Sequence, residues 1–112
     1  MNLSLRTKRN DKGQDVLFAG GEVDAFTAPQ LKESLVSLMQ QADVQVVVLD
    51  LTEVIYMDST GVGVIIGALK TCKAKGLQLV LENVPPRIER LFRITGLTEV
   101  VTIKPLQGEK PK

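Results

Sequence analysis

The 112-residue chain contains no histidine and no tryptophan, and it has a single cysteine. Histidine is the commonest general base and metal ligand, so its absence excludes Ser-His-Asp and Cys-His catalytic arrangements. A lysine could still activate a serine nucleophile, but no spacing in the sequence indicates such a pair. We therefore expect a protein that is not an enzyme and that needs neither a metal nor another cofactor.

The chain also lacks long apolar runs. No segment approaches the roughly 20 apolar residues that cross a bilayer, and residues 1–6 lack the apolar core of a signal peptide. The single cysteine, Cys72, has no disulfide partner and lies on an apolar helical stripe, which predicts a buried structural thiol. These absences predict a cytoplasmic protein without a membrane partner.

Positively and negatively charged residues nearly balance, which gives a net charge of +1, and only 4% of residues are aromatic. A nucleic-acid surface would need a basic stripe or aromatic stacking positions, so we expect no nucleic-acid partner. The main basic cluster, residues 70–75, is better explained as a solvated helix end. With 44% hydrophobic residues, the chain predicts one domain over residues 1–106, followed by a flexible polar tail at 107–112.

Hydrophobic periodicity predicts an α/β domain with a mixed sheet of four to five strands, an N-terminal hairpin and three or four helices. The segment Val44 to Leu49 is almost continuously aliphatic, as in a central strand covered on both faces. Thr27 and Gln30 have the spacing of a capping box at a helix start. Predicted strands cover residues 3–8, 16–23, 44–49, 77–81 and 99–103; predicted helices cover residues 27–41, 59–75 and 86–95, and residues 50–58 are expected to form a connection.

The run from Met57 to Gly63 places two hydroxyl groups and two glycines at a predicted helix start. A helix start carries unpaired N–H groups and the positive end of the helix dipole, so it tolerates an anion. A phosphoryl group on Ser59 would therefore leave the helix folded and change the surface charge. Right-handed crossovers are expected to bring Asp24, Asp50 and Ser59 together at one sheet edge.

The helix after Ser59 has two distinct faces. One is a core stripe, and the other carries the small or weakly polar residues Val64, Gly67, Ala68 and Thr71. Periodicity alone favours packing of this second stripe inside the domain over docking of a partner next to Ser59.

Two other sites are less consistent with the sequence. A dinucleotide site would need a glycine where Ile66 stands and a glycine-rich turn directly after a strand, whereas a long connection is expected here. Asp50 could accept a phosphoryl group in a two-component receiver, but the first strand lacks the acidic pair that would hold magnesium. Ordinary turn and capping chemistry is the simpler explanation for Asp24, Asp50 and Asp58.

Three motifs in order resemble those of anti-sigma factor antagonists of the STAS family, the bacterial partner-switching proteins. The resemblance covers nearly the whole chain. The motifs are Gly21-Glu22-Val23-Asp24 with Thr27-Ala28-Pro29, Tyr56-Met57-Asp58-Ser59-Thr60-Gly61-Val62-Gly63, and Leu91-Phe92-Arg93-Ile94-Thr95-Gly96-Leu97. The resemblance implies a single STAS-like domain.

The resemblance also implies a function. An anti-sigma factor that is itself an ATP-dependent serine kinase would phosphorylate Ser59, and a PP2C-type phosphatase would remove the phosphate. The unmodified form would bind the anti-sigma factor and release the sigma factor. Thr60 is a second candidate acceptor. The implied partner surface, which turns the small-residue stripe toward docking, comprises Asp24, Asp58, Thr60, Gly61, Gly63, Val64 and Gly67.

Two residues depart from the family pattern. Gly20 doubles the glycine before Glu22, and Arg93 stands where relatives often carry an acidic residue. Either change could alter partner choice. The alternative function is a STAS accessory subunit of a membrane transporter or sensory assembly, which shares the fold and need not be phosphorylated.

Overall fold

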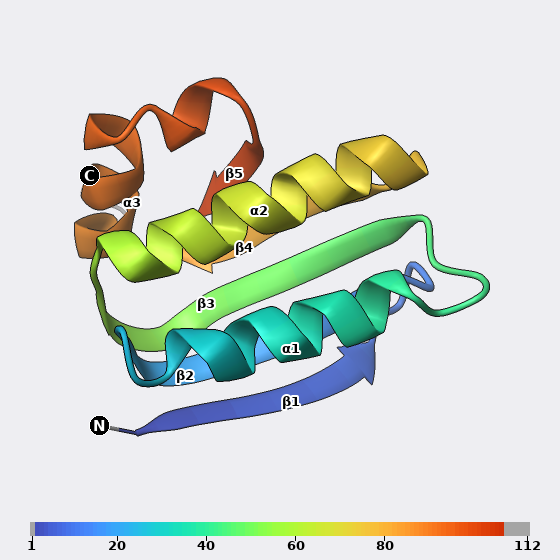
Figure 1. Cartoon of the computed structure of the whole chain (residues 1–112), viewed down its shortest axis with the longest axis horizontal. Coiled ribbons are helices and arrows are strands. Elements are labelled where there is room, and N and C mark those ends of the chain that lie inside the picture. Colours follow the sequence, from blue (N-terminus) through green and yellow to red (C-terminus); the bar gives the residue numbers. More distant parts are fainter. Residues whose placement is uncertain (1, 107–112) are drawn as a thin grey trace.

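Five strands form one sheet, and their order across it, β1-β2-β3-β4-β5, is their order along the chain (Figure 1). The computed structural model describes residues 2–106. β1 and β2 are antiparallel, and every later pair of neighbours is parallel. The elements are β1 (Leu3–Arg9), β2 (Asp15–Val23), α1 (Ala28–Met39), β3 (Val46–Met57), α2 (Ser59–Lys75), β4 (Gln78–Val84), α3 (Pro86–Ile94), the 3-10 helix η1 (Leu97–Glu99) and β5 (Thr102–Pro105).

The predicted mixed sheet, N-terminal hairpin and helix count are confirmed. The polar tail predicted at residues 107–112 lies outside the described residues. The last strand begins later than expected because η1 occupies the start of the predicted range. Within residues 2–106, no helix combines the length and apolar character required to span a bilayer.

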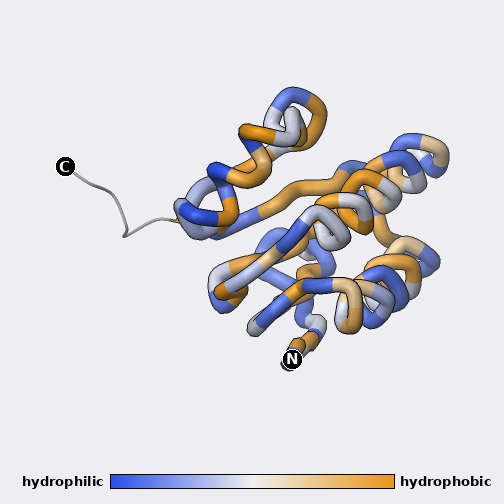
Figure 2. Tube along the Cα trace, turned by 60° about the vertical axis from the view of Figure 1, so that its left-hand side comes forward, coloured by the Kyte–Doolittle hydropathy of each residue, from blue (hydrophilic) through white to orange (hydrophobic). Residues whose placement is uncertain are grey.

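The main core lies between one face of the sheet and the helices. Helices α1 and α2 run side by side across this face (Figure 1), and every buried helical side chain belongs to the same apolar cluster. In Figure 2, hydrophobic segments of the strands lie beneath helices that alternate between hydrophobic and hydrophilic residues. Cys72 is buried in this core, as predicted, and burial raises the pKa of its thiol above 9.0.

The opposite face of the sheet has a smaller cluster made of Val16, Val48 and Val80, which lie in register on three neighbouring strands. The prediction of a central strand covered on both faces is confirmed, because Val47, Val48 and Leu49 are each at most 1% exposed and β3 is the middle strand. Side chains of the strands help to shield this second face; the Arg6 guanidinium, for example, lies 4.8 Å from the centre of the Phe18 ring. Successive side chains along β2 and β3 point to opposite faces of the sheet. The large core residues therefore lie on one face, and the smaller valine cluster lies on the other.

Strand β3 continues through residues that were predicted to form a connection. Asp50 lies in the middle of the strand and is only 6% exposed. Its Oδ1 accepts hydrogen bonds from the backbone and hydroxyl of Thr52, at 2.9 and 2.6 Å, and its Oδ2 accepts one from Asn83 Nδ2 at 2.7 Å. Because these donors satisfy the buried carboxylate, the strand passes it and ends at Met57.

We expect Asn83→Ala to destabilise the fold by about 1–3 kcal/mol, because a buried carboxylate would lose a donor. Asn83 also has a left-handed backbone, with φ of 52°, which alanine adopts less readily. Asn83→Gly removes the same donor but relieves the backbone, so it should cost less than Asn83→Ala. Urea denaturation of the two variants measures both contributions. Equal stability of Asn83→Ala and the wild type would contradict a stabilising role for this contact.

Candidate functional site

Strands β2 and β3 end side by side at one edge of the sheet. Val23 pairs with Met57, and the Asp58 backbone N–H donates to the Val23 carbonyl at 3.2 Å. Four residues separate β2 from α1 and one residue separates β3 from α2, so both helices begin at the same edge (Figure 1). Asp24 and Asp58 directly follow this last pair of residues, so they lie next to each other where the two strands end. Asp50 does not join them, contrary to expectation, because it lies within β3.

Ser59 is the first residue of α2 and is exposed. The cap of the helix is supplied by Asp58, whose Oδ1 accepts from the Thr60 N–H at 2.9 Å. The Asp58 carbonyl also accepts from the N–H groups of the next turn. The helix cap therefore does not depend on the Ser59 hydroxyl, and Ser59 is exposed at the positive end of the helix dipole.

The turn before α1 is held by a local hydrogen-bond network. Asp24 is 8% exposed, and its Oδ1 accepts from the N–H groups of Phe26 and Thr27 at 2.9 and 3.1 Å. The Thr27 hydroxyl accepts from Asp24 N at 2.9 Å and donates to the Glu22 carbonyl at 2.8 Å. Asp24 thus shapes this turn from within it.

The predicted capping box is wrong. Thr27 is the residue before α1, as expected, but its side chain makes no cap hydrogen bond. The hydroxyl is already engaged by Glu22 and Asp24, so it points back into the turn rather than toward the helix. Instead, the Thr27 carbonyl accepts from the N–H of Gln30 at 3.0 Å.

Phe26 was missed by sequence reasoning. It lies in the turn held by Asp24 and Thr27, and 84% of its surface is exposed. Among the large apolar residues that are exposed within residues 2–106, it has the greatest exposed fraction. A bulky aromatic residue between a strand and a helix, where polar residues are usual, is the signal that could have indicated it.

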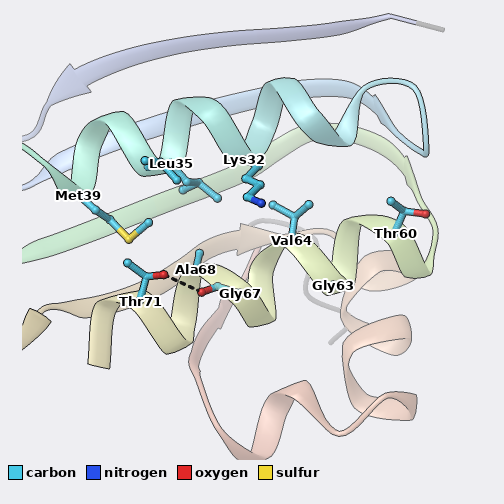
Figure 3. Close-up of a pocket in the computed structure, with 10 residues that line it drawn as sticks. Lys32, Leu35, Met39, Thr60, Gly63, Val64, Gly67, Ala68 and Thr71 are labelled. Carbon is cyan, nitrogen blue, oxygen red and sulfur yellow. Dashed lines mark hydrogen bonds between the residues drawn. The ribbon is translucent and has the colours of Figure 1, made fainter. Parts of the chain in front are cut away.

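A groove of about 380 Å³ lies between α1 and α2. Its floor and walls are mostly apolar, and Thr60 lies at the end that is nearest to Ser59 (Figure 3). The small-residue stripe of α2 forms one wall. It packs partly inside the domain, since Ala68 is buried, and partly remains open, since Gly67 is exposed. The lining residues are Lys32, Leu35, Val36 and Met39 of α1, and Thr60, Gly63, Val64, Gly67, Ala68 and Thr71 of α2.

The three glycines of α2 have different surroundings. A Cβ on Gly61 would lie 2.6 Å from Met57 Cγ and 2.8 Å from Val23 Cγ1, so the close packing of α2 on the sheet requires glycine there. A Cβ on Gly63 or Gly67 would meet nothing within 4 Å. Glycine inside a helix is about 0.8–1.0 kcal/mol less favourable than alanine, and packing within the domain gives no reason for that cost at Gly63 and Gly67.

The alternative sites fit the geometry poorly. The long connection expected between the strand and the glycines is wrong, because α2 follows β3 after one residue. However, Ile66 still occupies the third glycine position, and Gly61 and Gly63 lie inside the helix rather than in a turn. Asp50 is enclosed by Thr52 and Asn83, unlike an accessible phosphoryl acceptor. Within residues 2–106, no group of three or more acidic or cysteine residues is placed to hold a metal ion.

The family model described as the STAS domain matches residues 6–109. The chain belongs to the STAS domain family. A relative from Listeria monocytogenes, named anti-sigma-B factor antagonist, is 45% identical over 109 residues, which are 97% of this chain and 95% of the relative. The motif resemblance to anti-sigma factor antagonists is therefore confirmed.

Solved structures agree with this STAS assignment at the level of the fold. An anti-sigma factor antagonist from Mycobacterium paratuberculosis superposes with a TM-score of 0.79 at 23% identity, covering 95% of this chain and 88% of that one. The Bacillus cell fate determinant SpoIIAA in its phosphorylated form superposes with a TM-score of 0.68 at 21% identity, covering 89% of this chain and 90% of that one.

Proposed function

We propose that this STAS protein is an anti-sigma factor antagonist controlled by phosphorylation of Ser59. In the unmodified form it binds an anti-sigma factor, which then releases its sigma factor. The observation that carries the proposal is the position of Ser59: an exposed hydroxyl at the start of α2, where Asp58 supplies the helix cap. The name of the Listeria relative and the phosphorylated form of SpoIIAA support it.

The anti-sigma factor would cover the edge that carries Ser59. Asp24 and Asp58 would shape this edge and contribute negative charge, while Thr60, Gly63, Val64 and Gly67 would contact the partner along the α1–α2 groove. Gly61 is buried, so it would act by holding α2 close to the sheet. The two exposed glycines allow another backbone to approach closely.

Charge would decide the state of the switch. A phosphoryl group adds about −1.5 to −2 charges beside Asp58, and covering it with a partner places like charges together in a desolvated interface. The helix dipole stabilises the phosphoryl group by at most about 2 kcal/mol, and it does so equally in the free protein and in the complex. Phosphorylation would therefore oppose binding without unfolding α2.

Other proteins would carry out the chemistry at Ser59. The sequence has no histidine to serve as a base, and we propose that the anti-sigma factor itself is the ATP-dependent serine kinase. A PP2C-type phosphatase would restore the unmodified form. The alternative role as an accessory subunit of a transporter is less well supported, because the Listeria relative aligns over 95% of its own length.

Incubation with the cognate anti-sigma factor and ATP should add one phosphoryl group, and Ser59→Ala should abolish its addition. Thr60→Ala is the matched control, since it removes the neighbouring exposed hydroxyl and should still be modified. Intact-mass spectrometry followed by peptide mapping measures both results. Unchanged labelling of Ser59→Ala, or labelling only at Thr60, would contradict the assignment.

A further inference from the structure

The turn between β2 and α1 displays an aromatic side chain that the fold does not use. Phe26 is 84% exposed, whereas the residues on both sides of the turn are tied down: Asp24 is 8% exposed and Thr27 is 3% exposed. Single exposed apolar residues are common on protein surfaces and need no special explanation. The position and rigidity of Phe26 distinguish it from such residues.

Rigidity comes from hydrogen bonds to the backbone of the turn. The Phe26 N–H itself donates to Asp24 Oδ1 at 2.9 Å, and the Thr27 hydroxyl bridges Asp24 N and the Glu22 carbonyl. The Ala28 N–H donates to the Asp24 carbonyl at 2.8 Å, which joins the turn to α1. A side chain on a fixed turn loses little conformational entropy on binding, and phenylalanine has only two rotatable side-chain bonds.

The pairing of β2 with β3 places Phe26 at the same edge of the sheet as Ser59. The turn follows Val23, whose carbonyl accepts from Asp58 N, and Asp58 directly precedes Ser59. Phe26 and Ser59 therefore flank the same pair of strand ends. The mouth of the α1–α2 groove lies at this edge as well, with Thr60 at its end (Figure 3).

We propose that Phe26 is the apolar anchor of the anti-sigma factor interface and inserts into an apolar pocket of that partner. The inference rests on the proposed function and adds a second component to it. Aromatic residues that become fully desolvated near the centre of an interface account for much of its binding energy. Phe26 would set the affinity of the complex, and the charge at Ser59 would determine when the complex forms.

The partner that would cover Phe26 is the anti-sigma factor, because Phe26 lies at the same strand ends as the residue that this partner would modify. An apolar anchor next to the acceptor also serves the kinase reaction, because it would contribute the same binding energy to the substrate complex and to the transition state of phosphoryl transfer. Its loss should therefore raise KM of the kinase for this protein and leave kcat nearly unchanged.

Phe26→Ala should weaken binding of the unphosphorylated protein to the anti-sigma factor by at least about thirtyfold, as is typical of an interface hot spot. Phe26→Leu keeps much of the apolar side chain and should lose less affinity than Phe26→Ala. Val100→Ala is the control, because Val100 is 52% exposed and precedes β5, at the opposite ends of the parallel strands from Ser59. Isothermal titration calorimetry gives the affinities, and steady-state phosphorylation with ATP gives KM and kcat.

A Phe26→Ala affinity within about threefold of the wild type, or an equal loss in Val100→Ala, would overturn the anchor. A fall in kcat at unchanged KM would also overturn it. Ser59→Asp in the same titration separates the two proposals. If Ser59→Asp weakens binding and Phe26→Ala does not, only the anchor fails; if wild-type protein itself does not bind the anti-sigma factor, the proposed function fails. Circular dichroism of Phe26→Ala should match the wild type, since the side chain packs little on the domain.

Discussion

Ser59→Asp should weaken binding to the anti-sigma factor by about a hundredfold or more, while α2 stays folded. Like charges brought together in an interface cost several kcal/mol, and each 1.4 kcal/mol corresponds to about tenfold in affinity. Aspartate carries one negative charge rather than nearly two, so its effect should be smaller than that of a phosphoryl group. The position at the start of α2 favours an acidic side chain in the free protein.

Ser59→Asn is the matched control for this substitution, because asparagine has nearly the size and shape of aspartate without the charge. Titration calorimetry should find the asparagine variant much closer to the wild type than the aspartate variant. Thermal denaturation followed by circular dichroism should find all three proteins similarly stable. Equal losses of affinity in the two variants would indicate that size rather than charge controls the complex, and this result would contradict the switch.

Replacement of two glycines of α2 by alanine should change the stability of the fold in opposite directions. Gly61→Ala should destabilise the fold by about 1–3 kcal/mol, since its Cβ would meet Met57 and Val23 at distances that require the chain to shift. Gly67→Ala should stabilise it by about 0.4–1 kcal/mol, because the added methyl group lies in open space and the unfolded chain loses freedom. Urea denaturation at equilibrium measures both changes.

The same position tests whether a partner uses the groove. Gly67→Leu places a large side chain in the space between α1 and α2, so it should weaken binding to the anti-sigma factor without lowering stability. Gly76→Ala is not a suitable control, because Gly76 has φ of 75° and alanine would be strained there. Ala74→Leu, at an exposed position near the end of α2 that does not line the groove, introduces the same leucine side chain. Similar affinities for Gly67→Leu and Ala74→Leu would argue against docking in the groove.

Local patterns predicted most of the fold because they reflect short-range physics. The 3.6-residue periodicity of α2, its start at Ser59 and its end at Gly76 were all visible in the sequence. The length of β3 was not, because Asp50 looks like a strand end. The donor that makes a buried carboxylate tolerable there, Asn83, lies 33 residues further along the chain.

The candidate site was predicted in outline but not in its details. Asp24 and Ser59 were expected at one edge, and the ends of β2 and β3 place them there. The Thr27 side chain could not be assigned, because the backbone groups that compete for its hydroxyl depend on the shape of the turn. The exposure of Phe26 was not predicted, since an apolar residue usually indicates burial and only its place between a strand and a helix pointed to exposure.

The order of strands in the sheet bears on how the protein is made. Each strand pairs with the strand that was synthesised just before it, so no strand waits for a later segment to fill a gap beside it. Ribosomes add about 5–20 residues per second, which is slow compared with the pairing of neighbouring strands. The sheet can therefore grow from the hairpin in the direction of translation, and the platform beneath Ser59, formed by β2, α1 and β3, can assemble before α2 is complete. A newly made chain would then be ready to compete for its partner soon after release.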